Sequence, residues 1–382
     1  MPRHRRYHVV FRADASRDIG TGHIMRCLTL ANVLQSQGLE CSFVCRPQLG
    51  DLIDLVRKSG YSVAELPQII LDQQPAEQQP AEQQIAHQHW LKTDWSTDAM
   101  QTQAALNRPV DFLIVDHYAL DARWERFIRQ SASKIMVIDD LADRPHDCDL
   151  LLDQNLGSTS QSYERLVPAH TTLLVGPEYA LLRPEFAAIR SHSLGRRRAA
   201  KPSKIMVSMG GVDKDNITSR VLTILDNFET ERELEVLIIM GPKAPWLRDV
   251  VSRARESRHP TTVLSNVTNM ATLMSETDIS VGAAGSTSWE RCALGLPTLL
   301  VILAENQREV GRRLAASGAA ELIDLDGNFC SQMAASLRLL LDNDEARRAM
   351  SDGASAICDG SGVFRVARAV LSLLSVDGEE VI

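Results

Sequence analysis

Short apolar runs alternate along this chain with longer segments that have the periodicity of a helix. His23–Gln37 carries apolar side chains at helical spacing and is followed by Gly38, a residue type that often ends helices. The shorter runs on either side, Tyr7–Phe11 and Cys41–Cys45, have the length and composition of buried strands. Because strands separated by helices form βαβ units, this pattern predicts a parallel sheet.

The first series adds a helix at Asp51–Ser59 and strands at Phe112–Val115 and Ile135–Ile138, which run into Asp116 and Asp139. A second series begins after residue 203. It predicts strands at Lys204–Ser208, Glu235–Met240, Thr261–Leu264, Ile279–Val281 and Thr298–Leu303, and helices at Asn216–Asn227, Met270–Ser275 and Ser286–Leu294. The fold class is therefore α/β, with two Rossmann-like, doubly wound parallel-sheet domains and a ligand-binding cleft between them.

We place the domains at residues 1–190 and 204–382, joined by a basic linker at 191–203. A Gln-rich insertion at about residues 69–95 contains Pro75-Ala76-Glu77-Gln78-Gln79 and its immediate repeat. Low complexity predicts an exposed loop or a frayed helix there, with His87 and His89 in solvent.

Composition narrows the class of protein. A chain of 382 residues with 44% hydrophobic and 24% charged residues is typical of a globular protein of about two domains. The net charge of −8 argues against nucleic acid as a partner, and the longest uncharged apolar stretch, Leu296–Ala304, is too short to span a bilayer. The seven cysteines are scattered, which favours reduced thiols. We expect a cytoplasmic monomer without membrane insertion.

The first candidate site follows the first strand. Gly20 and Gly22 permit a tight turn, and His23 lies at the start of the next helix, where it can act as an acid or base or simply pack the turn. Asp14 either orients His23 or caps a turn. Met25 occupies the third glycine position of a dinucleotide fingerprint, and no phosphate-binding G-x-x-x-x-G-K-[ST] motif is present.

Two further glycine turns lie in the second series. Gly210 and Gly211 follow a strand and either approach a phosphate or form an ordinary turn. Gly285-Ser286-Thr287 opens a helix that carries Glu290. This turn suits a diphosphate and Glu290 suits ribose hydroxyls, or else Ser286 and Glu290 are a capping pair.

Signals for a metal are weak. Asp147-Cys148-Asp149 matches the D-x-D pattern that holds manganese in one class of glycosyltransferases, but it opens the apolar, strand-like run Leu150–Leu152, which favours a structural role. Asp139-Asp140 ends a strand, which favours a turn or cap. We predict no metal and no cofactor.

Several motifs together resemble the nucleotide-sugar hydrolases of the pseudaminic acid pathway, which act on UDP-2,4-diacetamido-2,4,6-trideoxy-β-L-altropyranose, and the related spore-coat polysaccharide proteins. They are Arg12-Ala13-Asp14, Gly20-Thr21-Gly22-His23-Ile24-Met25-Arg26, Val115-Asp116-His117-Tyr118, Ile138-Asp139-Asp140, Cys148–Asn155, Gly176–Arg183, Met209–Asp213, and Gly285–Glu290 with Asn306-Gln307. The resemblance extends over nearly the whole chain, to about residue 375. Its C-terminal part is shared with GT-B glycosyltransferases.

The resemblance implies a GT-B fold and hydrolysis of a UDP-sugar by water, with inversion at the anomeric carbon. It implies His23 as the base, Asp14 as its orienting partner, and Tyr118 at the sugar or the water. The substrate-binding residues would be Gly20, Gly22, Arg26, Gly210, Gly211, Asp213, Gly285, Ser286, Thr287, Glu290, Asn306 and Gln307. The alternatives are a GT-B glycosyltransferase, a hydrolysing 2-epimerase and a nucleotide-sugar-binding protein without catalysis.

Overall fold

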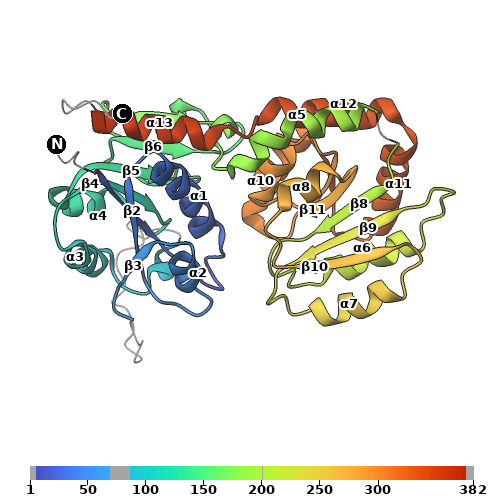
Figure 1. Cartoon of the computed structure of the whole chain (residues 1–382), viewed down its shortest axis with the longest axis horizontal. Helices are drawn as coiled ribbons and strands as arrows, with labels where there is room; N and C mark the ends of the chain where they lie inside the picture. Colours follow the sequence, from blue (N-terminus) through green and yellow to red (C-terminus); the bar gives the residue numbers. More distant parts are fainter. Residues whose placement is uncertain (1–5, 69–86, 200, 376–382) are drawn as a thin grey trace. The chain divides into compact units, whose positions relative to one another are not determined.

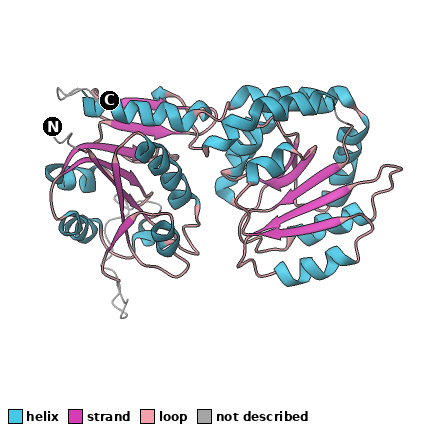
Figure 2. Ribbon diagram, viewed as in Figure 1, coloured by secondary structure: helices cyan, strands magenta, loops and turns pink. Residues whose placement is uncertain are grey.

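The computed structural model describes residues 6–68, 87–199 and 201–375. They form two compact units: unit 1 comprises the chain up to Leu181 together with the segment from Gly362, and unit 2 comprises Leu182–Ser361. Each unit is a parallel sheet flanked by helices (Figure 1; Figure 2). The predicted α/β class with two doubly wound sheets is confirmed.

Unit 1 contains a seven-stranded sheet in the order β3-β2-β1-β4-β5-β6-β7, and every pairing is parallel. The strands are β1 (His8–Ala13), β2 (Glu40–Cys45), β3 (Ser62–Glu65), β4 (Val110–Asp116), β5 (Ala132–Ile138), β6 (Leu150–Asp153) and β7 (Thr172–Val175). The helices are α1 (Gly22–Ser36), α2 (Ile53–Lys58), α3 (Trp95–Leu106), α4 (Ala122–Ile128) and α13 (Gly362–Ser375), with 3-10 turns η2 (Gln88–Leu91), η3 (Arg129–Ser131), η4 (Ser160–Tyr163) and η5 (Pro177–Tyr179).

The alternation of side chains along the strands of unit 1 fills two apolar layers. Val9 and Phe11 of β1 pack with α1, α2 and α13 on one face, whereas Val10 packs with α3 and α4 on the other. Gly38 has a φ of +90°, as expected for a glycine that ends α1. Burial on both faces explains why the strands are almost continuously apolar in sequence.

Unit 2 contains a six-stranded parallel sheet in the order β10-β9-β8-β11-β12-β13. Its strands are β8 (Lys204–Ser208), β9 (Glu235–Met240), β10 (Thr261–Ser265), β11 (Ile279–Ala283), β12 (Thr298–Val301) and β13 (Glu321–Ile323). Its helices are α5 (Pro184–Ala199), α6 (Ile217–Asp226), α7 (Leu247–Arg255), α8 (Met270–Ser275), α9 (Thr287–Ala293), α10 (Arg308–Ala316), α11 (Phe329–Asp342) and α12 (Asp344–Ile357), with the 3-10 turn η6 (Glu305–Gln307).

The expected domain boundaries differ from the structure in two places. The segment 191–203 is not a free linker, because most of it belongs to α5, where Arg197 is buried and donates to the backbone carbonyls of Leu294 (2.9 Å) and Met274 (2.7 Å). The second domain does not extend to residue 382, because α13 packs into the core of unit 1 through Val363 and Val366. Figure 1 shows α13 beside α1 in unit 1.

Both sheets have a point where the chain changes the side on which it adds strands. In unit 1 this point lies between β1 and β4, and in unit 2 between β8 and β11. Loops beyond the carboxyl ends of two such strands diverge and leave room for a ligand. The predicted site residues 14–26, 210–213 and 285–290 lie in the segments that follow β1, β8 and β11.

Candidate active site

The imidazole of His23 is held by a carboxylate at the switch point of unit 1. His23 is the second residue of α1, and its Nδ1 lies 2.6 Å from Oδ1 of Asp116, the last residue of β4. Both side chains are buried, with 8% of the His23 side chain exposed. Burial opposes ionisation of Asp116, but the charge of Arg26 and the hydrogen bonds from Arg26 and His23 outweigh it and hold the pKa of Asp116 well below its ordinary value. Asp116 therefore carries a negative charge next to the imidazole.

Arg26 and Tyr118 complete a polar network around this pair. The guanidinium of Arg26 donates to both carboxylate oxygens of Asp116, at 2.6 and 2.7 Å, and also to Asp140. The hydroxyl of Tyr118 donates to Asp140 at 2.7 Å, and its ring lies edge-on to His23 with the ring centres 4.6 Å apart. The structure thus brings together three predicted residues, His23, Arg26 and Tyr118. Because the guanidinium of Arg26 is already bonded to Asp116 and Asp140, its role in binding substrate stays a prediction.

Asp14 lies in a different network from His23. Its carboxylate accepts from Arg12 and from the backbone N–H of Arg46, each at 2.7 Å, and lies 3.4 Å from Nε2 of His117. Burial opposes ionisation of this carboxyl, but Arg12 and His117 more than compensate and depress the pKa of Asp14. The contacts therefore do not fit the prediction that Asp14 orients His23. The carboxylate that contacts His23 is that of Asp116. Asp14 instead joins the ends of β1 and β2.

The predicted glycine turns in unit 1 are formed as expected. Gly20 has a φ of +83° and its N–H donates to the carbonyl of Ser16 at 2.9 Å. Gly22 begins α1, whose preceding residue Thr21 makes no side-chain capping bond. The first turn of α1 is thus not capped by the side chain of Thr21.

The turn before α9 is the predicted diphosphate-binding segment of unit 2. Ser286 precedes α9 and its side chain makes no capping bond, so Ser286 and Glu290 are not a capping pair. Gly285 and Thr287 are half-buried and Ser286 is exposed. The side chain of Glu290 is 17% exposed and lies 3.9 Å from Nη2 of Arg183. Burial raises the pKa of Glu290 to about 7, although Arg183 and Arg291 oppose the shift.

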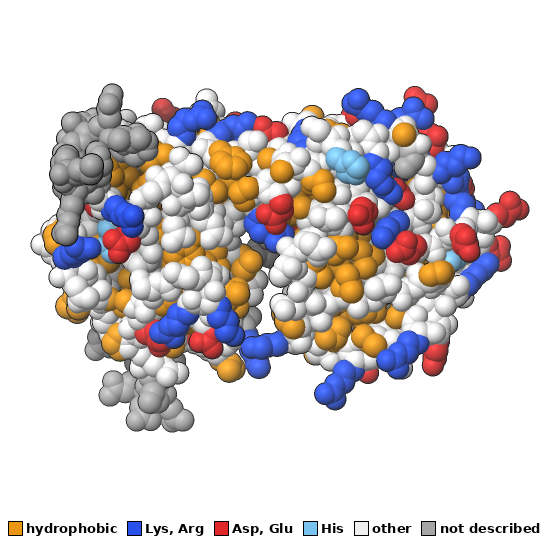
Figure 3. Space-filling model, in the orientation of Figure 1, with side chains coloured by type: hydrophobic (Ala, Val, Ile, Leu, Met, Phe, Trp, Pro, Cys, Tyr) orange, Lys and Arg blue, Asp and Glu red, His pale blue; other side chains and the backbone are white. Residues whose placement is uncertain are grey.

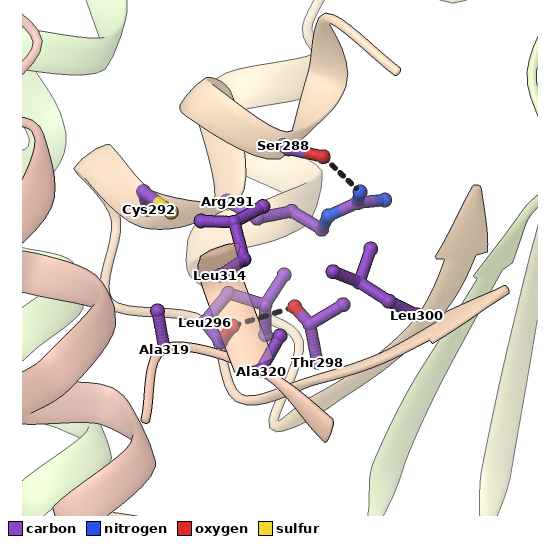
Figure 4. Close-up of a pocket in the computed structure, with 9 residues that line it drawn as sticks. All are labelled: Ser288, Arg291, Cys292, Leu296, Thr298, Leu300, Leu314, Ala319 and Ala320. Carbon is purple, nitrogen blue, oxygen red and sulfur yellow. Dashed lines mark hydrogen bonds between the residues drawn. The ribbon is translucent and has the colours of Figure 1, made fainter. Parts of the chain in front are cut away.

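A buried cation lies at the base of this turn (Figure 4). Nη2 of Arg291 donates to the carbonyl of Ala283 at 2.6 Å and to Oγ of Ser288 at 3.0 Å. Its Nε and Nη1 have no partner among the described residues, and the side chain borders a pocket of about 10 Å³, close to the smallest volume that holds a water. Burial lowers the pKa of Arg291 to about 10, which leaves it protonated at neutral pH. The turn therefore has a positive charge at its base, the sign that favours an anion.

The other predicted residues of unit 2 have structural contacts. Gly210 has a φ of +80°, and a Cβ on Gly241, the residue after β9, would meet the carbonyl of Gly211, so the Gly210-Gly211 turn packs tightly against the end of β9. Both carboxylate oxygens of Asp213 accept from the first N–H groups of α6, at 2.9 Å. Gln307 accepts from the backbone N–H of Leu303 at 3.1 Å. The side chain of Asn306 lies outside what the structure describes.

The aspartates of the two acidic motifs in unit 1 are bonded to basic side chains. Arg129 bonds both Asp147 and Asp149 of the D-x-D segment, and Asp139 accepts from Arg144 at 2.8 Å. Within residues 6–68, 87–199 and 201–375, no three His, Cys, Asp or Glu side chains converge as metal ligands would. The structural interpretation of the D-x-D segment fits these contacts.

Several residues of the site were missed by sequence reasoning. Asp116 and Asp140 were given no part in the chemistry, although both follow apolar strands whose carboxyl ends meet at one edge of the sheet. His87 was expected in solvent but is half-buried, with its ring centre 4.3 Å from that of Trp90. Residues 69–86 of the insertion lie outside the described residues.

The surface carries both signs of charge. Figure 3 shows Lys and Arg side chains interspersed with Asp and Glu on the visible face of each unit. Among the helices of the described residues, none is both long enough and apolar enough to cross a membrane. Of the seven cysteines, which all fall within the described ranges, Cys330 alone is exposed.

Comparison with known proteins places the chain in a structural class. It has the GT-B fold, and residues 204–361 match the family described as "Glycosyltransferase family 28 C-terminal domain". The crystal structure of MurG from Acinetobacter baumannii has a TM-score of 0.67 with this chain at 16% identity, covering 96% of this chain and 100% of MurG.

Three curated relatives are distant in sequence. The chain is 26% identical over 316 residues to the UDP-2,4-diacetamido-2,4,6-trideoxy-beta-L-altropyranose hydrolase of Campylobacter jejuni, a match that covers 81% of this chain and 97% of that protein. It is 24% identical over 301 residues to the uncharacterized protein MJ1062 of Methanocaldococcus jannaschii, covering 78% of this chain and 56% of the relative. It is 26% identical over 206 residues to the spore coat polysaccharide biosynthesis protein SpsG of Bacillus subtilis, covering 52% of this chain and 58% of SpsG. The chain thus spans little more than half the length of two of these relatives.

Proposed function

We propose that this protein hydrolyses a UDP-sugar to UDP and the free sugar by attack of water at the anomeric carbon. The observation that carries the proposal is the buried His23–Asp116 pair at the switch point of unit 1. A histidine held by an ionised carboxylate is a recurrent arrangement for a general base.

The contact with Asp116 determines which nitrogen of His23 can act. Because Asp116 is ionised, Nδ1 carries the proton of that hydrogen bond and Nε2 presents its lone pair. Nε2 can then accept a proton from the attacking water, and Asp116 stabilises the imidazolium that results. Tyr118, fixed by its bond to Asp140, would hydrogen-bond the sugar or the water.

Unit 2 would bind the nucleotide. Backbone N–H groups of Gly285, Ser286 and Thr287 would bind the diphosphate and stabilise the charge that develops on UDP as it leaves, with inversion at the anomeric carbon. Glu290 would accept hydrogen bonds from the ribose hydroxyls. The match of residues 204–361 to the glycosyltransferase family 28 C-terminal domain supports this assignment. No cofactor is needed for this chemistry.

For the sugar, we propose 2,4-diacetamido-2,4,6-trideoxy-β-L-altropyranose, which would place the protein in nonulosonic acid biosynthesis. The support is the 26% identity to the Campylobacter hydrolase over 97% of that protein's length. The motifs around His23 and Tyr118 belong to the same resemblance.

The test is proton NMR of the purified protein with UDP-2,4-diacetamido-2,4,6-trideoxy-β-L-altropyranose in the presence of EDTA. We expect UDP and free sugar in equal amounts, with the configuration at C2 retained. A change at C2 would indicate a 2-epimerase, and UDP binding without any turnover of this substrate would contradict the proposal.

A second candidate is a glycosyltransferase that passes the sugar to an acceptor. The observation that favours it is the family match itself, since residues 204–361 match a domain of glycosyltransferases. The same NMR experiment separates the two, because a transferase needs an acceptor for rapid release of UDP.

A further inference from the structure

Three aromatic side chains of unit 1, Trp90, Tyr118 and His87, gather beside the His23–Asp116 pair. The ring of Trp90 stacks on Tyr118 at an interplanar angle of 25°, with ring centres 5.7 Å apart, and lies edge-on to His23 at 6.2 Å. His87 is close to both, at 4.3 Å from Trp90 and 5.6 Å from Tyr118. Trp90 and His87 follow the Gln-rich repeat, a segment for which the sequence predicted no function. They are therefore unexpected neighbours of the candidate base.

The position of Trp90 is fixed by its neighbours along the chain. Leu91 is fully buried in the apolar layer under α3 and α4, which anchors the turn η2. The backbone carbonyl of Trp90 accepts from Nε2 of Gln48 at 3.0 Å, and Nζ of Lys92 lies 3.4 Å from Asp18. Gln48 follows β2 and Asp18 follows β1, so the turn is bonded to the two loops at the edge of the sheet where His23 lies.

Trp90 adds an apolar surface to a site that is otherwise polar. His23 belongs to a hydrogen-bonded network whose other side chains are Asp116, Arg26, Asp140 and Tyr118. These groups suit hydroxyl and amide groups of a ligand. A half-buried indole beside them suits carbon-bound hydrogens and methyl groups, because aromatic faces bury a large apolar area.

We propose that Trp90, supported by His87, is a specificity-determining residue that contacts the sugar and favours sugars with methyl groups, such as 6-deoxy and N-acetylated sugars. This inference rests on the proposed function of the His23 site as the sugar-binding side of a UDP-sugar hydrolase. It goes beyond it by assigning the recognition of the sugar to a side chain outside the motifs of the resemblance.

The test compares Trp90→Ala, Trp90→Phe and Trp95→Ala with the unaltered protein. Trp95 is a matched control because it is also half-buried and packs on the core of unit 1, but its indole lies under Arg123 and not on Tyr118. We expect Trp90→Ala to lower kcat/KM for the diacetamido-trideoxy UDP-sugar about tenfold, with the affinity for UDP unchanged. Trp90→Phe should recover most of this loss, and Trp95→Ala should show neither effect.

A second readout does not depend on turnover. In saturation-transfer NMR, the acetyl and C6 methyl protons of the bound UDP-sugar should receive strong transfer from the unaltered protein. That transfer should fall in Trp90→Ala relative to the uridine protons. Two results would overturn the inference: an equal loss of kcat/KM in Trp90→Ala and Trp95→Ala, or saturation transfer to the methyl protons that is the same in Trp90→Ala as in the unaltered protein. If the unaltered protein binds this UDP-sugar with strong methyl transfer but does not hydrolyse it, the proposed hydrolysis fails while the inference about Trp90 stands.

Discussion

His23 and Asp116 are 93 positions apart in the sequence, yet Nδ1 of the imidazole lies 2.6 Å from the carboxylate. The strand order makes this contact possible. β1 pairs directly with β4, and Ala13 of β1 is in register with Asp116. The loop after β1 therefore returns into α1 above the end of β4, where the first turn of the helix places His23 against the carboxylate.

The first prediction concerns the base. His23→Ala should fold and bind UDP but lose a factor of about 10²–10⁴ in kcat, the usual contribution of a general base. The measurement is UDP release under saturating substrate, with calorimetric titration of UDP as the control for binding. Full activity in this variant would exclude His23 as the base.

The second prediction separates the two buried aspartates. Asp116→Asn should lower the free energy of unfolding by about 3–5 kcal/mol, because it removes one partner of a buried ion pair with Arg26. Asp14→Asn is a matched control, since Asp14 is equally buried and pairs with Arg12.

Both variants should lose stability in urea, but only Asp116→Asn also removes the carboxylate that bonds His23. Its kcat, measured on the folded protein, should fall further than that of Asp14→Asn. A larger loss of kcat in Asp14→Asn would restore Asp14 as the partner of His23 in catalysis.

The third prediction is a pH dependence of nucleotide binding. The pKa of Glu290 is raised from 4.5 to about 7, so in the free protein the carboxyl takes up a proton as the pH falls below 7. If ribose binding needs the carboxylate, the affinity for UDP should rise with pH and level off above 7, changing about tenfold per pH unit below it. In Glu290→Gln, the remaining pH dependence of the UDP affinity comes from the titration of UDP itself. If Glu290 does not bind the ligand, the unaltered protein and the variant should show the same pH dependence.

The same shift has an opposite effect on folding. Because the folded protein binds this proton more tightly than the unfolded chain, the contribution of Glu290 to the free energy of unfolding should decrease as the pH rises from 4.5 to 7.

The fourth prediction concerns the buried Arg291. A Cβ on Gly282 would lie 2.2 Å from Nη1 of Arg291 and 3.0 Å from the carbonyl of Ser208. Gly282→Ala should therefore destabilise unit 2 by about 1–3 kcal/mol, the usual cost of overpacking a core. Gly195→Ala is the control: Gly195 lies in α5 with open space around it, so helix propensity predicts a gain of about 1 kcal/mol. Urea denaturation of both variants gives the comparison.

Local patterns in the sequence determined much of the fold. The predicted strands Lys204–Ser208 and Glu235–Met240 and the helix Met270–Ser275 have the same bounds in the structure, because apolar periodicity reports burial directly. His23 at the start of a helix was likewise readable from the glycine turn before it. Such features depend on neighbours in the chain.

Features that depend on distant parts of the chain were not readable. The partner of His23 is decided by the adjacency of β1 and β4, which periodicity does not reveal, so the nearby Asp14 was preferred over Asp116. The basic run of α5 resembled a linker because the carbonyls that Arg197 binds come from segments 77 to 97 residues away. The proposed role of Trp90 in sugar recognition was not predicted, because the low complexity of the repeat before it indicated an exposed loop or a frayed helix.

The return of α13 to unit 1 sets an order of events during synthesis. Unit 2 is continuous in sequence, whereas unit 1 completes its core with Val363, Val366 and Val370. At ordinary elongation rates, the ribosome needs roughly 10–40 seconds to make the intervening segment. During that interval the nascent first half exposes the apolar surface of α1 that α13 later covers. Unit 1, most of which is made first, is thus completed last.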